Sequence, residues 1–314
     1  MEKKKFIILL MSCNQPLYLN EEQACRDTFL KDAEGADIPF YFYRGGEEHQ
    51  YIDTDHVMHL SCPDGLGGTS EKTVLAMTAA LQLGGWDYLI KTNVSTWLNI
   101  EKITDMINGL EGKNDVNIYG ARYLINTASK NVPFPRGHFS IFSRSMVEGI
   151  VKWSPKLIAA KNFPKTDDTL IGLSCLYQIM KVNGEQYLDR IMEVPAVNSW
   201  PEDGRIEDAP EISDALCIRC KDEKTPENTV DNMRKVHGMM RAEMRPDRRH
   251  YRPAKWFETG FGIVDYKMYG TISAIYKAVR KYTANKDFKA ENGTVKRTDS
   301  ETKKNELKKK NELS

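Results

Sequence analysis

The chain has 314 residues, 40% of them hydrophobic and 28% charged, with 45 Lys and Arg residues against 44 Asp and Glu. This composition is typical of a globular protein, and a net charge of +1 excludes the strong overall positive field of many nucleic-acid-binding proteins. The apolar run after the basic amino terminus covers only Phe6–Met11, which is too short for a signal peptide or a spanning helix. We therefore expect a cytoplasmic protein that binds no nucleic acid.

The first half of the chain alternates between expected strands and expected helices. Lys5–Ser12 is a continuous apolar run, typical of a central strand buried on both faces, and Asn20 can cap the helix that follows. Strands are expected at Ile38–Gly45 and at residues 56–60. Thr69 can cap the next helix, which two glycines end before a further strand at residues 86–92.

Strands that alternate with helices predict an α/β fold with a mainly parallel central sheet. In such sheets ligands bind at the carboxyl ends of the strands, where Ser12, Arg44 and Asn93 would gather. The second half continues with strand-like runs, a helix after Asp167 and Asp168, and another helix near Glu227–Glu243.

Three regions are expected: a catalytic core at residues 1–205, a partly helical extension at 206–282 and a disordered tail at 283–314, rich in Lys, Glu and Asn. Phe261–Tyr282 predicts a helix whose apolar side is bordered by basic residues. Such a helix can lie on an anionic membrane, which would place the protein at the inner face of the cell membrane, or it can pack on the catalytic domain.

Five segments in order resemble motifs of the β-1,3-galactosyltransferase and fringe-like group of GT-A glycosyltransferases. They cover the chain from Lys5 to about Tyr187 and read "ACRDTF", "SEKT", "YLIKTNVSTWLN", "RGHFSIFSRSMVEGI" and "KTDDTLIG". The resemblance implies a Rossmann-like GT-A domain that transfers a hexosyl unit, galactose-type or similar, from a UDP-sugar to a saccharide acceptor. It also implies that the transfer inverts the anomeric carbon, forms a β-1,3 linkage and serves polysaccharide or glycan biosynthesis.

Matching the last motif places Asp168 at the family's general base, with Asp167 beside it as an orienting or acceptor-binding acid. Inverting transfer needs one base to take the proton of the acceptor hydroxyl, and a carboxylate at a helix amino end can be placed rigidly beside a sugar. The alternative interpretation of "TDDT" is a pair of helix-capping acids without a catalytic role.

The family's metal-binding acidic turn is replaced by Asn93, Val94 and Ser95, and no histidine follows the base helix in "IMEVPAVNSWPEDGR". Hard ions such as Mg²⁺ and Mn²⁺ prefer carboxylate oxygens, so metal is disfavoured and cations must neutralise the departing diphosphate. The donor-binding residues expected from the motifs are Ser12, Arg26, Lys72, Lys91, Asn93 and Ser95. Acceptor-binding residues are expected to be Arg136, His138 and Trp200, although each cation could equally be a solvated surface charge.

Cys217 and Cys220 form a CxxC motif, and a zinc site would need two more ligands, for which His237 is the one candidate nearby. We therefore expect reduced thiols in a partly buried loop and no zinc site. Two other functions remain open. One is a catalytically silent module that binds a nucleotide sugar or a glycan, and the other is a different α/β nucleotide-binding enzyme. The absence of "GxGxxG" after the first strand and of "GxxxxGK[ST]" disfavours dinucleotide-binding and P-loop proteins.

Overall fold

The computed structural model of the protein describes residues 3–110, 112, 117–121, 123–126, 132–159, 166–183, 190–201, 204–208, 212 and 214–243. The chain divides into two compact units, Met1–Val264 and Asp265–Ser314, and every described residue lies in the first. The helix expected at Phe261–Tyr282 and the tail that follows it lie outside the described residues. Within the described part of the chain, no helix is long and apolar enough to cross a bilayer.

The core of the fold is an eight-stranded sheet with the strand order β11-β7-β10-β5-β1-β2-β4-β3. Its strands are β1 Phe6–Met11, β2 Phe40–Arg44, β3 Tyr51–Ile52, β4 Val57–His59, β5 Tyr88–Asn93, β7 Ile118–Gly120, β10 Phe139–Ser143 and β11 Ile191–Glu193. The pairs β1–β2, β1–β5, β2–β4 and β7–β11 are parallel, whereas β10 runs antiparallel to both β5 and β7. The predicted α/β fold with a mainly parallel sheet is confirmed.

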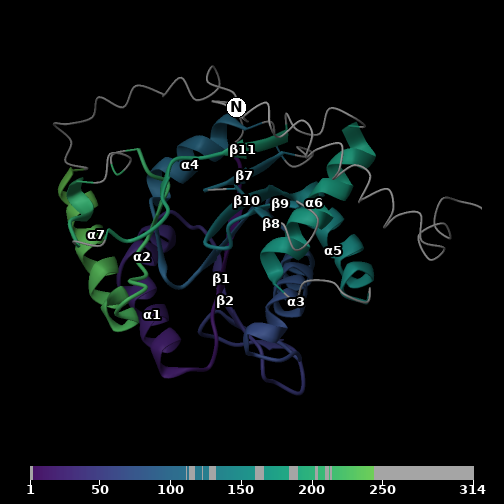
Figure 1. Ribbon diagram of the computed structural model, residues 1–314, viewed down its shortest axis with the longest axis horizontal. Helices are drawn as coiled ribbons and strands as arrows, with labels where there is room; N and C mark the ends of the chain where they lie inside the picture. Colours follow the sequence, from purple (N-terminus) through teal and green to yellow (C-terminus); the bar gives the residue numbers. More distant parts are fainter. Residues whose placement is uncertain are drawn as a thin grey trace, which may run out of the picture. The chain divides into compact units, whose positions relative to one another are not determined.

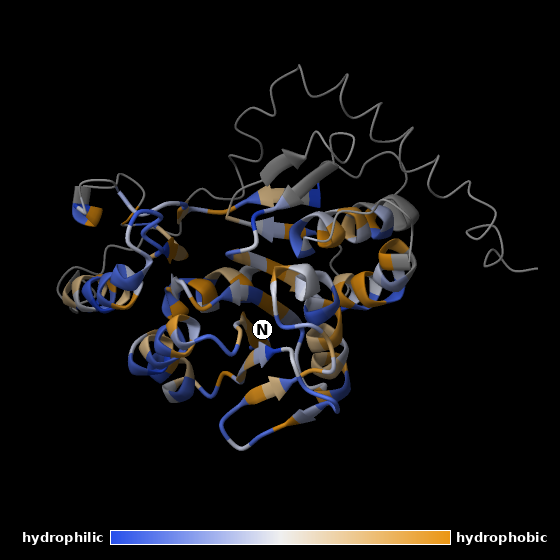
Figure 2. Ribbon diagram, turned by 60° about the horizontal axis from the view of Figure 1, so that its bottom comes forward, coloured by the Kyte–Doolittle hydropathy of each residue, from blue (hydrophilic) through white to orange (hydrophobic). Residues whose placement is uncertain are grey.

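Helices cover both faces of this sheet, as Figure 1 shows, with α1, α2 and α7 on one side of the strands and α3, α5 and α6 on the other. Their bounds are α1 Pro16–Asp27, α2 Phe29–Gly35, α3 Thr69–Leu83, α4 Ile100–Gly109, α5 Arg144–Ala159, α6 Asp167–Asn183 and α7 Thr229–Glu243. Blue and orange alternate around these helices in Figure 2, as expected for helices with one face on the sheet and one in water.

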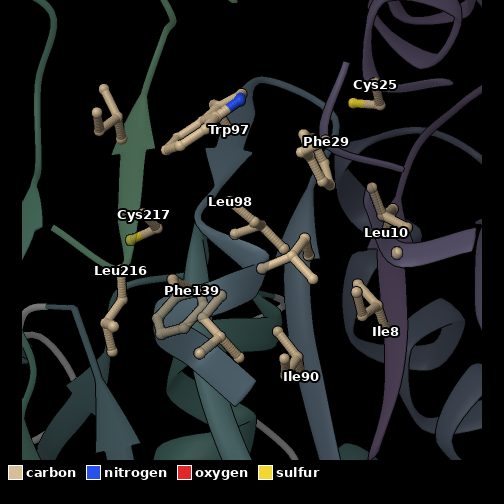
Figure 3. Packing of buried hydrophobic residues seen from close by; sticks show 14 of the residues in the cluster. Ile8, Leu10, Cys25, Phe29, Ile90, Trp97, Leu98, Phe139, Leu216 and Cys217 are labelled. Carbon is tan, nitrogen blue, oxygen red and sulfur yellow. The ribbon is translucent and has the colours of Figure 1, made fainter. Parts of the chain in front are cut away.

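Strand β1 is buried on both faces, as its continuous apolar sequence predicted. Phe6, Ile8 and Leu10 pack in one cluster with Cys25 and Phe29 from the helices on one side, all of them 4% exposed or less. Figure 3 shows this cluster continuing from β1 across β5 to the residues around Trp97. The large apolar surface removed from water here holds the sheet and the α1 side together.

Two helices begin elsewhere than the capping residues predicted. Helix α1 starts at Pro16, so Asn20 lies inside it, because a proline at the first helical position needs no N–H partner and has a helical φ already. Helix α3 follows a short 3₁₀ turn at Leu66–Gly68, which makes Thr69 its first residue and Gly68 its cap. Both helices exist as predicted, and only their amino ends differ.

A second sheet of three short strands lies beside the central one, in the order β12-β13-β6. Its members are β6 Thr96–Leu98, β12 Ala196–Val197 and β13 Cys217–Arg219, and a separate hairpin pairs β8 Tyr123–Asn126 with β9 Val132–Pro135. Cys217 is the first residue of β13 and Cys220 directly follows its last, and both are fully buried, so the expectation of thiols in a partly buried loop is wrong. Strand β13 and helix α7, which follow residue 205, thus contribute to the same core as the strands before it.

Candidate active site

Polar side chains gather at one edge of the central sheet. The parallel strands β1, β2 and β5 end there, with Ser12 directly after β1 and Asn93 as the last residue of β5. Strand β10 runs the opposite way, so its first residues reach the same edge, and Phe139 pairs with Thr92. This antiparallel strand brings Gly137 and His138 beside the end of β5, which the sequence alone did not indicate.

A buried lysine holds the acidic pair at the start of α6. The ammonium of Lys91 lies 2.6 Å from Oδ2 of Asp167 and 3.9 Å from Oδ1 of Asp168, and it donates a hydrogen bond of 3.1 Å to the carbonyl oxygen of Gly137. The side chain of Lys91 is 2% exposed, compared with 9% for Asp167 and 26% for Asp168. Asp168 is therefore the carboxylate of the pair that a ligand can reach.

The electrostatics of the three side chains separate the roles of the two acids. Burial disfavours the charge of Lys91, but the carboxylates of Asp167 and Asp168, together with Tyr43, outweigh burial and raise its pKa, so the ammonium stays protonated. Burial, and then the negative charge of Asp167, raise the pKa of Asp168 to about 7, although Lys91 opposes the shift. A carboxyl group with a pKa near neutrality can accept a proton and release it again.

Gly137 lies against Asp168, so closely that no side chain fits between them. A Cβ atom built on Gly137 would lie 2.3 Å from Oδ1 of Asp168, below any normal contact. The carboxylate of Asp168 therefore explains why position 137, in "PRGH", is occupied by a residue without a side chain.

His138 is buried and neutral at this edge. Its Nε2 lies 3.1 Å from Oδ1 of Asn198, whose amide orientation is set by a bond from Nδ2 to the carbonyl of Ala196. Nε2 therefore donates, and Nδ1, which is buried without a hydrogen-bond partner, is the acceptor. Burial, and then the charges of Arg219 and Arg136, lower the pKa of His138 to about 3, so it stays neutral at physiological pH.

The turn after β5 is closed by its own hydrogen bonds. Oδ1 of Asn93 accepts from the hydroxyl groups of Ser95, at 2.9 Å, and Thr96, at 2.8 Å, and Val94 is buried. No group of three or more His, Cys, Asp or Glu residues suited to a metal ion occurs among the residues that the structure describes. With a neutral amide oxygen already engaged by two hydroxyls, this turn does not fit the carboxylate-rich site that Mg²⁺ or Mn²⁺ prefers.

Asp64 connects the loops that follow β1 and β2 through hydrogen bonds to both. Its carboxylate accepts hydrogen bonds from the backbone N–H groups of Asn14, at 2.6 Å, and Gly45, at 2.7 Å. It also accepts from Lys72 at 2.9 Å, and the same ammonium donates to the carbonyl of Ser12 at 2.7 Å. Lys72 is thus 2% exposed and engaged by the protein, and the hydroxyl of Ser12 is buried without a hydrogen-bond partner.

The remaining predicted residues divide between this edge and other places. Arg136 donates to the carbonyl of Asn198 at 3.3 Å and so lies beside His138. Trp200 is half-buried and packs against the apolar core. Arg26 is not brought to this edge, because it contacts the carbonyl of Asp55 in the loop before β4 and lies over the ring of Phe42. Its expected contact with a donor therefore has no support in the geometry.

Arg44, the less certain donor-site cation, binds Glu22 with two nitrogen atoms, and Glu22 is buried. The residues that sequence reasoning missed are Asp64, Gly137, Asn198 and Arg219. The glycine-rich "PDGLGG" marks the loop of Asp64, but no local pattern marks Asn198 or Arg219, which reach the site through β12 and β13.

No family model and no curated protein sequence matches this chain. Two solved structures are similar at 13% identity. A glycosyltransferase involved in the glycosylation of the major capsid of PBCV-1 has a TM-score of 0.44, over 72% of this chain and 99% of that one. Mannosyltransferase PcManGT from Pyrobaculum calidifontis, in complex with GDP-Man and Mn²⁺, has a TM-score of 0.36, over 90% of this chain and 84% of that one.

Proposed function

We propose that the protein is a GT-A glycosyltransferase that moves a sugar from a nucleotide-sugar donor to a hydroxyl group of a saccharide acceptor. The observation that carries the proposal is Asp168, an accessible carboxylate with a pKa of about 7 at the ligand-binding edge of a mainly parallel sheet. The ordered motifs of the sequence support the same activity, because Asp168 occupies the position of the family's general base.

The reaction is an inverting displacement. As the acceptor oxygen attacks the anomeric carbon, its proton passes to a carboxylate oxygen of Asp168. The bond between that carbon and the donor's phosphate oxygen breaks, and the nucleoside diphosphate leaves. Lys91 and Asp167 hold Asp168 in place, since their ion pair is buried beneath it. The carboxylate is thus positioned before the substrate binds, which lowers the entropic part of the barrier.

The donor is proposed to be a UDP-sugar, with a hexosyl group of galactose type or similar, and to bind near Ser12, Asn93 and Ser95. Lys72 supports the donor side through its bonds to Ser12 and Asp64. Arg136, His138 and Trp200 are proposed for the acceptor side. A saccharide acceptor linked to a lipid would fit a peripheral position at the inner face of a membrane.

We propose that the transfer does not need a metal ion, because the Asn93 turn supplies no carboxylate and its amide oxygen is engaged by Ser95 and Thr96. Release of UDP from a panel of UDP-sugars with a mixed saccharide acceptor pool, in EDTA and again in Mn²⁺, tests the proposal. Acceptor-dependent release in EDTA is expected. Release only with Mn²⁺ would refute metal independence.

The base is tested by Asp168→Asn, with Asp105→Asn as the matched control, because Asp105 is an exposed residue of α4 that takes no part in the site. Asp168→Asn is expected to keep the fold and nucleotide binding while acceptor-dependent turnover is lost, and Asp105→Asn should leave turnover unchanged. If the wild-type protein binds UDP-sugars but transfers none to a broad acceptor pool, it is a silent binding module.

A further inference from the structure

The cations expected to meet a donor diphosphate are engaged elsewhere. The side chains of Lys91 and Lys72 are 2% exposed and are bound to Asp167 and Asp64. Arg44 binds the buried Glu22 with two nitrogen atoms. Arg26 contacts the loop before β4. A leaving diphosphate carries negative charge that must be stabilised, and the turn of Asn93 does not fit the metal ion that the fold family uses there. A positive group at this turn would supply that stabilisation.

Arg219, the last residue of β13, lies directly across from that turn. Strands β13 and β6 are antiparallel, and Arg219 pairs with Thr96. The backbone N–H of the next residue, Cys220, donates to the carbonyl of Ser95 at 2.9 Å. The turn and the end of β13 are therefore fixed to each other by main-chain pairing on both sides of Arg219.

The side chain of Arg219 points to the same face as the polar atoms of the turn. Directly paired residues of an antiparallel ladder project to one face, so Arg219 and Thr96 share theirs. The hydroxyl of Thr96 reaches Oδ1 of Asn93 at 2.8 Å, which identifies this face as the one that carries Asn93. The next pair on the same face is Cys217 with Leu98, and Figure 3 shows both beside Phe139, the first residue of β10. This face of the three-stranded sheet is therefore turned toward the carboxyl end of β5 and the amino end of β10.

Long-range electrostatics agree with this position. The positive charge of Arg219 lowers the pKa of Asp168, of His138 and of Glu21, which belong to α6, to the segment before β10 and to α1. Its ion-pair partner is Glu223, at 3.4 Å, which is 70% exposed and is shared with Lys221 at 3.3 Å. A solvent-exposed, shared pair of this kind is weak, so Arg219 can exchange it for a more strongly charged ligand.

We propose that Arg219 binds the diphosphate of the donor in place of a metal ion. The inference rests on the proposed function and assigns the cation at its donor site. The side chain of Arg219 is 18% exposed, about as much as that of Arg44, but Arg219 is paired with an exposed glutamate and Arg44 with a buried one. Once released from Glu223, its planar fork can form two parallel hydrogen bonds to phosphate oxygens. Asn93 and Ser95 belong to the turn that β13 pairs with and would contact the same diphosphate.

The test compares binding of UDP, GDP and their monophosphates by titration calorimetry in EDTA, for the full chain and for Arg219→Gln. Glu223→Gln is the matched control, because it removes the same ion pair and keeps the guanidinium. Whichever of UDP and GDP binds more tightly, Arg219→Gln is expected to lower the affinity for it by about 10- to 100-fold. The affinity for the corresponding monophosphate should fall by less. Glu223→Gln should bind as tightly as wild type or tighter, and Arg219→Lys should fall in between.

The outcomes separate this inference from the function on which it rests. If wild type binds a nucleoside diphosphate in EDTA and Arg219→Gln, folded by circular dichroism, binds it equally well, the role of Arg219 is refuted and the transferase stands. Binding by wild type only in Mn²⁺ likewise refutes it. If wild type binds none of the four nucleotides, with or without Mn²⁺, the proposed function fails and the inference fails with it.

Discussion

The backbone of Gly137 lies directly against the carboxylate of Asp168, so that a Cβ atom on the glycine would stand 2.3 Å from Oδ1. Gly137→Ala must therefore displace Asp168 or the loop that carries the glycine. Because a displacement of about 1 Å can cost on the order of 100-fold in rate, we expect kcat to fall by about that factor with the fold retained. Gly238→Ala is the control, since nothing lies within 4 Å of its Cβ position in α7. Full activity in Gly137→Ala would contradict the assignment of Asp168.

The buried ion pair of Lys91 predicts a stability effect. Lys91→Met leaves the carboxylate of Asp167 buried without its cation, and removal of one partner of a buried pair costs about 3–5 kcal/mol. We expect the free energy of unfolding, measured in urea, to fall by that order. The double variant Lys91→Met, Asp167→Asn should recover much of the loss, because the more buried carboxylate is then neutral and Asp168 can take up a proton. An equal loss in the double variant would mean that packing, and not charge, is the cause.

The acid limb of the pH–rate profile reports on Asp168. Its raised pKa, about 7, predicts that kcat/KM rises with pH through the neutral range as the carboxyl group loses its proton and becomes the active base. Burial is the largest cause of the shift, and the charge of Asp167 is the second. Asp167→Asn removes that charge and lets Lys91 turn to Asp168, so the limb should move to lower pH. A limb that stays at the same pH would show that another group titrates.

The raised pKa of Glu21 makes the stability of the protein depend on pH. It is 3% exposed on α1, and burial raises its pKa from 4.5 to about 7. The folded state therefore binds this proton more tightly than the unfolded chain does. The stabilising contribution is complete below pH 4.5 and is lost as the pH rises through about 7, with a total of about 3 kcal/mol.

Glu21→Gln keeps the neutral form at every pH. We expect this variant to be more stable than wild type at pH 8 and to differ little from it at pH 4, in urea unfolding at both values. A variant that is less stable than wild type at pH 8 would show that the ionised carboxylate is needed there.

The six cysteines differ in access to thiol reagents. Cys13 is partly exposed, whereas Cys25, Cys62, Cys175, Cys217 and Cys220 are buried. We expect iodoacetamide to label Cys13 first in the folded protein, slowly at pH 7 because burial raises the pKa of its thiol. Peptide mass spectrometry after short exposure gives the order. Early labelling of Cys217 or Cys220 would mean that β13 opens readily.

Local patterns in the sequence were enough to predict the parts of the fold that depend on them. The apolar strands β1 and β5 and the acids at the start of α6 are where continuous apolar runs and capping chemistry placed them. The partners of charged side chains were not predictable in the same way. The sequence contains Lys91, Lys72 and several acids, but only the packing of α6 shows that Lys91 meets Asp167, and only the course of the loop before α3 shows that Lys72 meets Asp64.

The strands β12 and β13 show the same limit. Each has two or three residues, too few for an alternating pattern, and each finds its partner far away in the chain. No local pattern in the sequence therefore marks Arg219, the last residue of β13, as a cation near the candidate site.

The pairing of β13 with β6 has a consequence for the protein during its synthesis. Leu98 leaves the ribosome roughly 120 residues before its partner Cys217, which is about 6–24 s earlier at 5–20 residues per second. During that interval β6 has an unpaired edge, and the side chains of Trp97 and Leu98 lack the cover that β13 and α7 give them. The nascent chain is then most open to aggregation and to chaperones, and its active site is completed only after more than two thirds of the chain has been made.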